Sequence, residues 1–341
     1  MIMGKFKLEI EDLKTYYFLD EGLLKAVDGI NLHLKKKEVV GIIGESGCGK
    51  SVFVKSIMRI IQKPGYHISG KINLEIDNNV ITDLASLNPT GNEIRKIRGK
   101  IISMIFQEPM TSLSPVHTIG SQIIETIILH RNSNKNEAKE IAFDMIDAVG
   151  IPNPKQRFYE YPYQFSGGMR QRAMIAMALS CNPSILIADE PTTALDVTVQ
   201  AQILELIDKL KDIYGTSIIY ITHDLGVIAE TSDKVYVMYL GKIVEISNVK
   251  EIFNEPKHPY TKALINSIPR IDKEVKKLNP IEGNVPVPIN LEWKCGFSNR
   301  CEFVTSKCLK SVPALSGSEE HKVSCFLYSD IEENKDEWSQ I

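Results

Sequence analysis

The chain has 341 residues, of which 43% are hydrophobic, and a formal net charge of -3. This length accommodates one large domain or two modest domains with a substantial core, and the composition excludes wholesale disorder. The slightly acidic balance argues against a dedicated nucleic-acid binder, which usually carries a basic face, so we expect no nucleic-acid partner.

Strand and helix patterns alternate along most of the chain. Residues 5–40 alternate short β-like runs with turn residues, as in a small antiparallel layer. Further strand patterns cover 38–44, 101–107, 185–190, 217–224 and 234–247, and helical patterns cover 51–61, 118–150 and 170–180. This order predicts an α/β fold with a mostly parallel core sheet, an antiparallel β layer and a helical subdomain.

The pattern changes around Pro256. A segment beginning His258-Pro-Tyr-Thr is followed by a Pro-rich stretch and then by a cysteine-rich region. Such a change in composition is typical of a boundary, so we predict a main domain over 1–255 and a small C-terminal extension over 256–341.

The N-terminus is charged and has no apolar core followed by a small-residue cleavage site, as a secretory signal would have. No run approaches the roughly 18 apolar residues of a membrane span. We therefore expect a cytosolic chain, in which thiols stay reduced and a cysteine cluster more often binds metal than forms disulfides.

A phosphate-binding loop follows the apolar run at 38–44. The stretch GESGCGKS fits the pattern G-x-x-x-x-G-K-[ST], in which glycines let successive N–H groups converge on an anion. Lys50 supplies a charge between the β- and γ-phosphates, and the Ser51 hydroxyl can ligate Mg²⁺. The alternative is a glycine turn that merely caps a helix. The predicted loop residues are Gly44, Glu45, Ser46, Gly47, Cys48, Gly49, Lys50 and Ser51.

Polar side chains stand at the ends of three predicted strands. Asp189 would hold the Mg²⁺ shell through water, and Glu190 would orient or deprotonate the attacking water. His223 would contact the γ-phosphate, and Gln107 would reach Mg²⁺ or the water. The alternatives are a solvated turn and a surface histidine. We predict Glu190, His223 and Lys50 as catalytic residues, and Ser51, Gln107 and Asp189 as the magnesium site.

The stretch Ser166-Gly167-Gly168-Met169 begins a predicted helix, with Ser166 at the cap position. A good helix start is the simpler interpretation. An exposed helix N-terminus with two glycines also receives phosphate. Because the chain already has one phosphate loop, the second receptor suggests a site that another subunit completes.

These motifs, in this order, resemble those of the ATP-binding cassette (ABC) ATPases over about residues 5–255. The resemblance implies two cassettes that clamp two ATP molecules head to tail, with the Ser166–Met169 signature touching the partner's ATP. It implies that Tyr17 stacks on adenine, with Tyr16 as the alternative, and that Asp196 communicates across the dimer. Gln107 would also sense the membrane subunits. Met169 stands where the commonest signature of the family has glutamine.

The HPYT segment and its surroundings resemble the oligopeptide/dipeptide importer branch. This implies an ATPase subunit at the cytoplasmic face of the membrane that energises uptake of di- and oligopeptides. Its implied partners are a second ABC ATPase (a heterodimer, or a homodimer in isolation), two permease subunits and, indirectly, an extracytoplasmic peptide-binding protein. The alternatives are an importer for nickel or another small solute, and a non-transport cassette ATPase with a redox-sensing cluster.

Four cysteines crowd the extension with spacings of x5, x6 and x16, which match no tight C-x2-C zinc ribbon. The importer resemblance implies a [4Fe-4S] cluster on them, with zinc or unligated thiols as alternatives. These are Cys295, Cys301, Cys308 and Cys325. Cys181 has the setting of a small buried hydrophobe. Cys48 is either a thiol with a lowered pKa or a small side chain that fits the loop.

Overall fold

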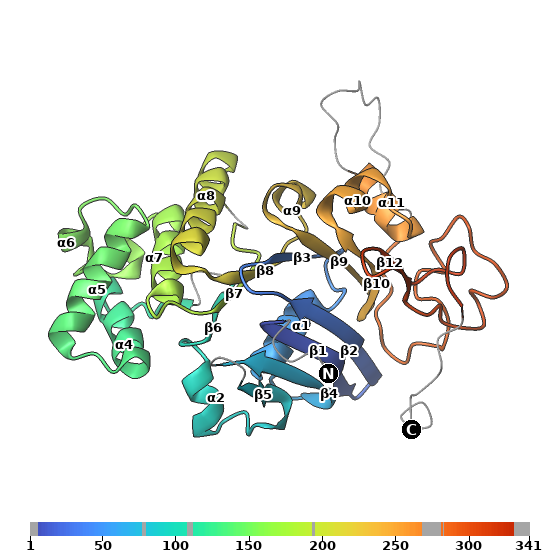
Figure 1. Ribbon diagram of the computed structural model, residues 1–341, viewed down its shortest axis with the longest axis horizontal. Coiled ribbons are helices and arrows are strands. Elements are labelled where there is room, and N and C mark those ends of the chain that lie inside the picture. The colour runs from blue at the N-terminus through green and yellow to red at the C-terminus, as the bar shows by residue number, and fades with distance from the viewer. Residues whose placement is uncertain are drawn as a thin grey trace.

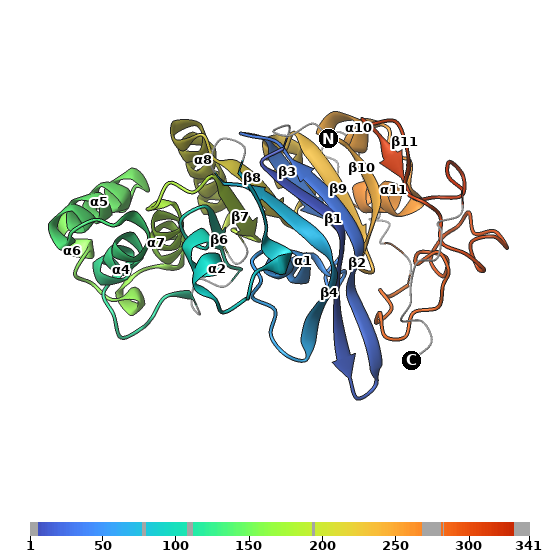
Figure 2. The same ribbon diagram turned by 60° about the horizontal axis from the view of Figure 1, so that its bottom comes forward.

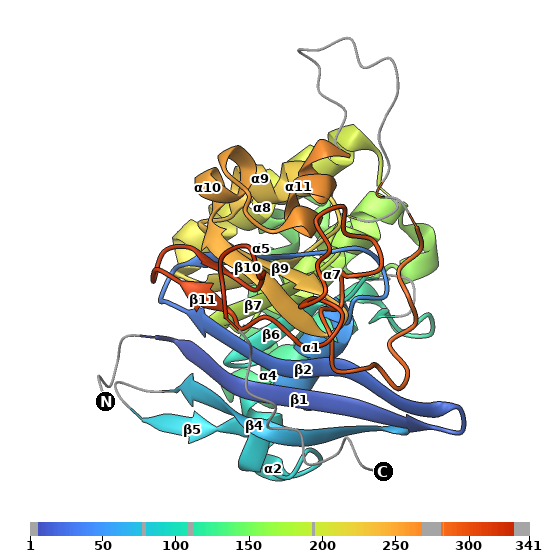
Figure 3. The same cartoon turned by 90° about the vertical axis from the view of Figure 1, so that its right-hand side faces the viewer.

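The computed structural model describes residues 6–76, 80–107, 112–192, 195–267, 281 and 283–330. Two sheets form its centre (Figure 1). A four-stranded sheet has the order β2-β1-β4-β5, and an eight-stranded sheet has the order β11-β12-β10-β9-β3-β8-β7-β6. Seen from the side, the four-stranded sheet is the lower layer, the larger sheet lies above it, and α8 to α11 cover the upper face (Figure 3).

The smaller sheet is antiparallel throughout. It confirms the predicted layer at 5–40 and adds two strands that the patterns did not indicate. Buried Leu and Ile side chains of this sheet join the apolar cluster that also contains the inner face of helix α1. The strands are β1 (Leu8–Leu19), β2 (Gly22–Leu34), β4 (Gly65–Glu75) and β5 (Ile81–Asp83).

The larger sheet is parallel from β9 to β6. Every residue of β3, β7 and β8 is buried, which explains why these strands appear in the sequence as continuous apolar runs. The strands are β3 (Val39–Ile43), β6 (Ile102–Ile105), β7 (Ile185–Asp189), β8 (Ser217–Ile221), β9 (Lys234–Tyr239), β10 (Lys242–Asn248), β11 (Ser316–Gly317) and β12 (Lys322–Val323).

Helices α4 to α7 form a subdomain at one end of the molecule, and the extension lies at the other end (Figure 2). This arrangement confirms the predicted helical insert. The helices are α1 (Lys50–Ile57), α2 (Asn92–Ile97), α4 (Ile119–Arg131), α5 (Lys135–Ala148), α6 (Pro154–Arg157), α7 (Gly167–Leu179), α8 (Val197–Tyr214), α9 (Leu225–Thr231), α10 (Val249–Asn254) and α11 (Pro259–Asn266). In the ranges described, no helix is long and apolar enough to cross a bilayer.

Helix α1 is shorter than the pattern at 51–61 predicts. It ends at Ile57, because Arg59 adopts a left-handed backbone conformation with φ of 55°. The Arg98 guanidinium then donates hydrogen bonds to the carbonyl oxygens of Met58 and Arg59, at 2.8 and 2.6 Å. The predicted helix was therefore too long, since a side chain distant in sequence satisfies carbonyls that a longer helix would have bonded.

The extension packs directly on the main domain. Its strand β12 pairs with β10, with Val323 opposite Glu245, so the extension lengthens the central sheet. An isolated bridge joins Ile289 to Leu24 of β2 in the other sheet. The extension, which has few helices and strands of its own, therefore contacts both the larger and the smaller sheet.

Candidate functional site

A cavity of about 460 Å³ opens beside the phosphate loop. It lies where β3 and β7 end, which is the edge that binds ligands in open parallel sheets. The described residues that line it come from the loop, from β1 and β2, from strand ends and from the extension. They are Tyr17, Leu24, Ala26, Ser46–Val52, Gln107, Glu190, Gly241 and residues 285–288.

The loop needs glycine at its first and last glycine positions. Gly44 and Gly49 have φ of 156° and 104°, in the region that favours glycine. A Cβ atom on Gly44 would lie 2.2 Å from the Met238 carbonyl oxygen, and one on Gly49 would lie 2.1 Å from the Ala26 carbonyl oxygen. The backbone therefore turns tightly against two strands, and α1 begins immediately afterwards at Lys50.

Lys50 and Ser51 are the first two residues of α1, directly after the loop. Lys50 is buried, and its Nζ donates to the carbonyl oxygens of Gly44 and Glu45 at 2.6 and 2.9 Å. The Ser51 hydroxyl donates to Asp189 Oδ1 at 3.2 Å. Burial raises the pKa of the Asp189 carboxyl, and the Ser51 hydrogen bond opposes this shift. A hydroxyl beside a carboxylate is a donor set that fits Mg²⁺.

Glu190 joins the ends of three strands. Its carboxylate accepts a hydrogen bond from Gln107 Nε2 at 3.0 Å and lies 3.2 Å from His223 Nδ1. Its backbone N–H donates to the Ile221 carbonyl oxygen at 2.8 Å, and its φ is 48°. Gln107 and Glu190 line the cavity, whereas His223 is exposed and contacts Glu190 from outside that lining. The side chains that the sequence places at the ends of three strands therefore meet at one edge of the sheet.

Tyr16 and Tyr17 point to different places. Tyr16 is fully buried, and its hydroxyl donates to Asp28 Oδ1 at 2.6 Å. Tyr17 lines the cavity. Only Tyr17 of this pair is therefore available to a ligand in the cavity.

The signature residues do not reach the cavity of their own chain. Ser166 caps α7, because its Oγ accepts a hydrogen bond from the Met169 N–H at 3.3 Å. A Cβ atom on Gly167 would meet nothing within 4 Å. Asp196 similarly caps α8 through Oδ1 and the Val199 N–H at 3.0 Å. None of Ser166, Gly167, Gly168, Met169 and Asp196 lines the described cavity.

Cys48 is not an activated thiol. It is 1% exposed, and burial raises its pKa, although Lys50 opposes the shift. The interpretation as a thiol with lowered pKa is therefore wrong, because desolvation outweighs the position at a helix start. Cys181 is buried just after α7, as predicted for a small hydrophobe.

The four cysteines of the extension line one cavity of about 100 Å³ together with the rings of Phe297, Phe303 and Phe326. All four are free thiols. Burial, and then the neighbouring thiols, raise the pKa of Cys295 to about 12. Among the residues with described positions, no group of three or more His, Cys, Asp or Glu side chains is arranged to hold a metal ion.

Two residues of the extension hold the phosphate loop, and the sequence patterns did not indicate either contact. Arg300 donates to both carboxylate oxygens of Glu45, at 2.7 and 3.0 Å, and the Tyr260 hydroxyl accepts from the Glu45 N–H at 2.7 Å. Tyr260 belongs to the HPYT segment, so this contact joins that segment to the phosphate loop. The sequence signals that could have indicated these contacts were the HPYT motif and the position of Arg300 between two cysteines.

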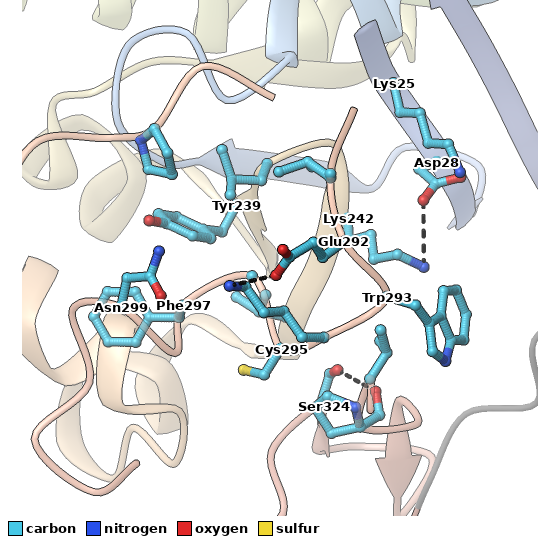
Figure 4. Close-up of a pocket in the computed structure, with 18 of the residues that line it drawn as sticks. Lys25, Asp28, Tyr239, Lys242, Glu292, Trp293, Cys295, Phe297, Asn299 and Ser324 are labelled. Atoms are coloured by element: carbon cyan, nitrogen blue, oxygen red, sulfur yellow. Dashed lines mark hydrogen bonds and ion pairs between the residues drawn. The ribbon is translucent and has the colours of Figure 1, made fainter. Parts of the chain in front are cut away.

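A further cavity of about 300 Å³ lies between the extension and the main domain. Figure 4 shows Tyr239, Phe297 and Cys295 at its border, and Lys242 reaching toward Asp28. The Lys242 Nζ lies 3.6 Å from Asp28 Oδ2 and 5.5 Å from the centre of the Trp293 ring. Charged and aromatic side chains thus connect the extension to β2 and β10 around this cavity.

Comparison with known proteins gives consistent matches. A family model described as "ABC transporter" matches residues 27–193, and one described as "Oligopeptide/dipeptide transporter, C-terminal region" matches 244–308. The oligopeptide transport ATP-binding protein AppD of Bacillus subtilis is 51% identical, over 95% of this chain and 97% of its own length. The dipeptide transport ATP-binding protein DppD of the same organism is 46% identical, over 94% of each chain.

Solved structures match most of this chain. The dimeric post-hydrolysis state of the ATP-binding cassette MJ0796, bound to ADP and Pi, has a TM-score of 0.62 and 27% identity. The match covers 71% of this chain and 98% of that one. The cbiO1 protein of Clostridium perfringens, part of the transporter complex cbiONQ, has a TM-score of 0.60 and 27% identity, over 74% of this chain and 92% of that one.

Proposed function

This chain belongs to the ABC transporter family and to its oligopeptide/dipeptide transport branch, and we propose that it is the ATP-hydrolysing subunit of a peptide importer. The observation that carries the proposal is that the Glu190 carboxylate contacts the side chains of both Gln107 and His223 beside the phosphate loop. These three side chains come from three strand ends, and they form the group that positions water for attack on a bound triphosphate.

Each residue of the site has a chemical role in this proposal. The loop N–H groups and Lys50 bind the phosphates, and Tyr17 stacks on the adenine. Ser51, Gln107 and Asp189 would hold Mg²⁺, Asp189 through water, and the ion supplies positive charge against the phosphate oxygens. Glu190 accepts the proton of the attacking water, while Gln107 and His223 hold its carboxylate in place.

We propose that a second cassette completes the site. Ser166, Gly167 and Gly168 are the contacts offered to the partner's ATP, with Met169 packing beside them, and Asp196 communicates between the subunits. This is supported by the absence of these residues from the described lining of their own cavity. It is also supported by the dimeric state of the MJ0796 cassette. The partner is a different ABC ATPase in the transporter, and a second copy of this chain in isolation.

The same proposal places the subunit at the cytoplasmic face of the membrane, on two permease subunits, with an extracytoplasmic peptide-binding protein acting indirectly. Residues 1–255 form the ATPase and 256–341 the extension. The names of the relatives favour peptides over nickel or another small solute as the substrate.

We further propose that Cys295, Cys301, Cys308 and Cys325 hold a [4Fe-4S] cluster. Four free thiols that border one cavity are a donor set for such a cluster. A single zinc ion, the alternative, needs four sulfur atoms within roughly 4 Å of each other. Thiolate donors suit either group, and the colour of protein purified without oxygen distinguishes the cluster from zinc.

The test of the function is reconstitution with candidate permeases. The subunit, a partner ATPase and two permeases are placed in vesicles that enclose the binding protein with a peptide, with nickel or with neither. We expect ATP hydrolysis to rise when a di- or oligopeptide is supplied and not when nickel is supplied. Stimulation by nickel alone would replace the peptide assignment, and ATP hydrolysis that responds to neither would contradict the importer.

A further inference from the structure

One wall of the nucleotide cavity comes from the C-terminal extension. Residues 285–288, with the sequence Val-Pro-Val-Pro, line the cavity together with Tyr17, Leu24 and Ala26. More than 200 positions in the sequence separate this segment from β2, so the fold alone brings them together. The predicted residues of the nucleotide site extend no further than His223, and none came from the extension.

The segment is fixed to the edge of β2 by the residues that follow it. Ile289 forms a bridge with Leu24, and the Asn290 N–H donates to the Leu23 carbonyl oxygen at 2.9 Å. The Asn290 side chain adds a second hydrogen bond to the same residue, in which its Oδ1 accepts from the Leu23 N–H at 2.8 Å. Its Nδ2 would lie 2.2 Å from a Cβ on Gly22, so the side chain sits closely over that glycine.

The chemistry of the wall is apolar. Val285, Pro286, Val287 and Pro288 carry no charge and no side-chain hydrogen-bonding group. Two prolines restrict the backbone, so the wall loses little conformational freedom when it meets a ligand. Val287 is 70% exposed, and it lies on a segment whose backbone is already held in place.

The loop side of the cavity has the opposite character, because it is lined by the glycine-rich loop and by Lys50, whose side chain is charged. A ligand that satisfies both sides has a polyanionic part and a flat apolar part. An adenine base meets Tyr17 with its ring face, and an apolar wall next to Leu24 and Ala26 removes further base surface from water.

We propose that residues 285–288 contact the adenine base of ATP, so that the extension is a structural part of the nucleotide site. The proposal rests on the proposed ATPase function. It assigns the extension a role in binding that does not depend on the cysteines. Val287 is the residue with the most surface to bury, and Asn290 is the anchor that keeps the wall beside β2.

Binding of two ligands separates base contacts from phosphate contacts. Dissociation constants for ATP and for inorganic tripolyphosphate, which has no base, are measured by calorimetry with Mg²⁺ on the full chain. Two variants test the wall, V287S and N290G. Glycine suits position 290, because Asn290 has φ of 49° and the change removes only the side-chain anchor. The matched control is V80S, since Val80 is 57% exposed beside β5, at the other edge of the small sheet.

We expect V287S and N290G each to raise the Kd for ATP about 3- to 10-fold, with the Kd for tripolyphosphate unchanged. V80S should leave both constants unchanged. Unchanged ATP affinity in both test variants would contradict the proposed contact between residues 285–288 and the adenine base. An equal rise in the Kd for ATP and for tripolyphosphate would also contradict it, because such a rise indicates a disturbed phosphate loop. A parent chain that binds no ATP contradicts the ATPase itself, whereas a parent that binds and hydrolyses ATP while the variants match it contradicts only this inference.

Discussion

Arg300 of the extension and Glu45 of the phosphate loop form a two-pronged ion pair, with N–O distances of 2.7 and 3.0 Å. The Arg300 side chain is 4% exposed, and its guanidinium lies about 6 Å from the ring centres of Tyr239 and Phe297. Paired N–H donors fix the orientation of a carboxylate as well as its distance. The extension thus holds Glu45, the second residue of the phosphate loop. The residue that makes this contact, Arg300, lies between Cys295 and Cys301 in the sequence.

Replacing Arg300 by glutamine should destabilise the fold and weaken phosphate binding. Loss of charge-assisted hydrogen bonds from a buried guanidinium should lower the free energy of unfolding by about 2 kcal/mol. The Kd for tripolyphosphate should rise together with that for ATP, unlike in the base-wall variants. Denaturant unfolding and calorimetry measure both effects. Arg95→Gln, an exposed change on α2, is the control, and an R300Q chain that binds both ligands as the parent does would contradict a positioning role.

Replacing Glu190 by glutamine should nearly abolish hydrolysis while ATP stays bound. Glutamine keeps the shape and still meets Gln107 and His223, but it accepts no proton from water. We expect the turnover rate to fall at least about 100-fold, measured as phosphate release, with little change in the Kd for ATP. The exposed Glu205→Gln on α8 serves as the control. Turnover close to that of the parent would remove Glu190 from the role of base.

Replacing Gly167 by aspartate should block the partner's site without harming the subunit. A Cβ there meets nothing within 4 Å, and a carboxylate in the first turn of α7 is favourable for the helix. The same charge repels a triphosphate presented by a second cassette. We expect normal ATP binding to the monomer and loss of ATP-dependent dimerisation in light scattering, with Gly167→Ala as the control. Dimers of G167D that form as readily as those of the parent would contradict the trans contact.

Replacing Cys301 by serine should remove a brown chromophore from protein purified without oxygen. The thiol borders the cavity shared by all four cysteines, and serine is a poor ligand for iron. ATP binding should remain largely intact, because Cys301 is not among the residues that line the nucleotide cavity. Cys181→Ala, a buried cysteine elsewhere, is the control for general damage. A colourless parent with stoichiometric zinc would reject the iron–sulfur proposal.

The buried His258 should make stability depend on pH. Burial lowers its pKa to about 3, whereas the unfolded value is near 6.5. Between these values only the unfolded chain binds the proton, so stability is intact above about pH 6.5 and declines as the pH falls toward 3. The slope reaches about 1.4 kcal/mol per pH unit.

His258→Asn is the matching variant. Asparagine still offers an oxygen to the Tyr260 N–H, which the histidine Nδ1 accepts at 3.0 Å, but it does not titrate. Between pH 7 and 5.5 the parent should lose about 1 kcal/mol more free energy of unfolding than H258N, measured by denaturant titration. Equal losses in the two proteins would show that His258 is not the titrating group.

Much of the fold follows from local patterns. Three strands of the larger sheet are buried on both faces, so their apolar composition is visible in the sequence without any partner. By contrast, β4 and β5 were not predicted, because they pair only with distant strands and with each other. Helix α8 was also not predicted, although Ile203, Leu204 and Ile207 recur at helical spacing on its buried face.

The sequence by itself determined the phosphate loop, the strand-end carboxylates and the capped signature helix, because each depends on neighbouring residues whose backbone conformation is local. Only the tertiary structure decided between Tyr16 and Tyr17, since one residue of register turns a strand side chain from the cavity to the core. It alone decided that desolvation raises the pKa of Cys48. It alone also brought Arg300 to Glu45 and residues 285–288 to the nucleotide cavity, because contacts across more than 200 residues leave no periodic trace in a sequence.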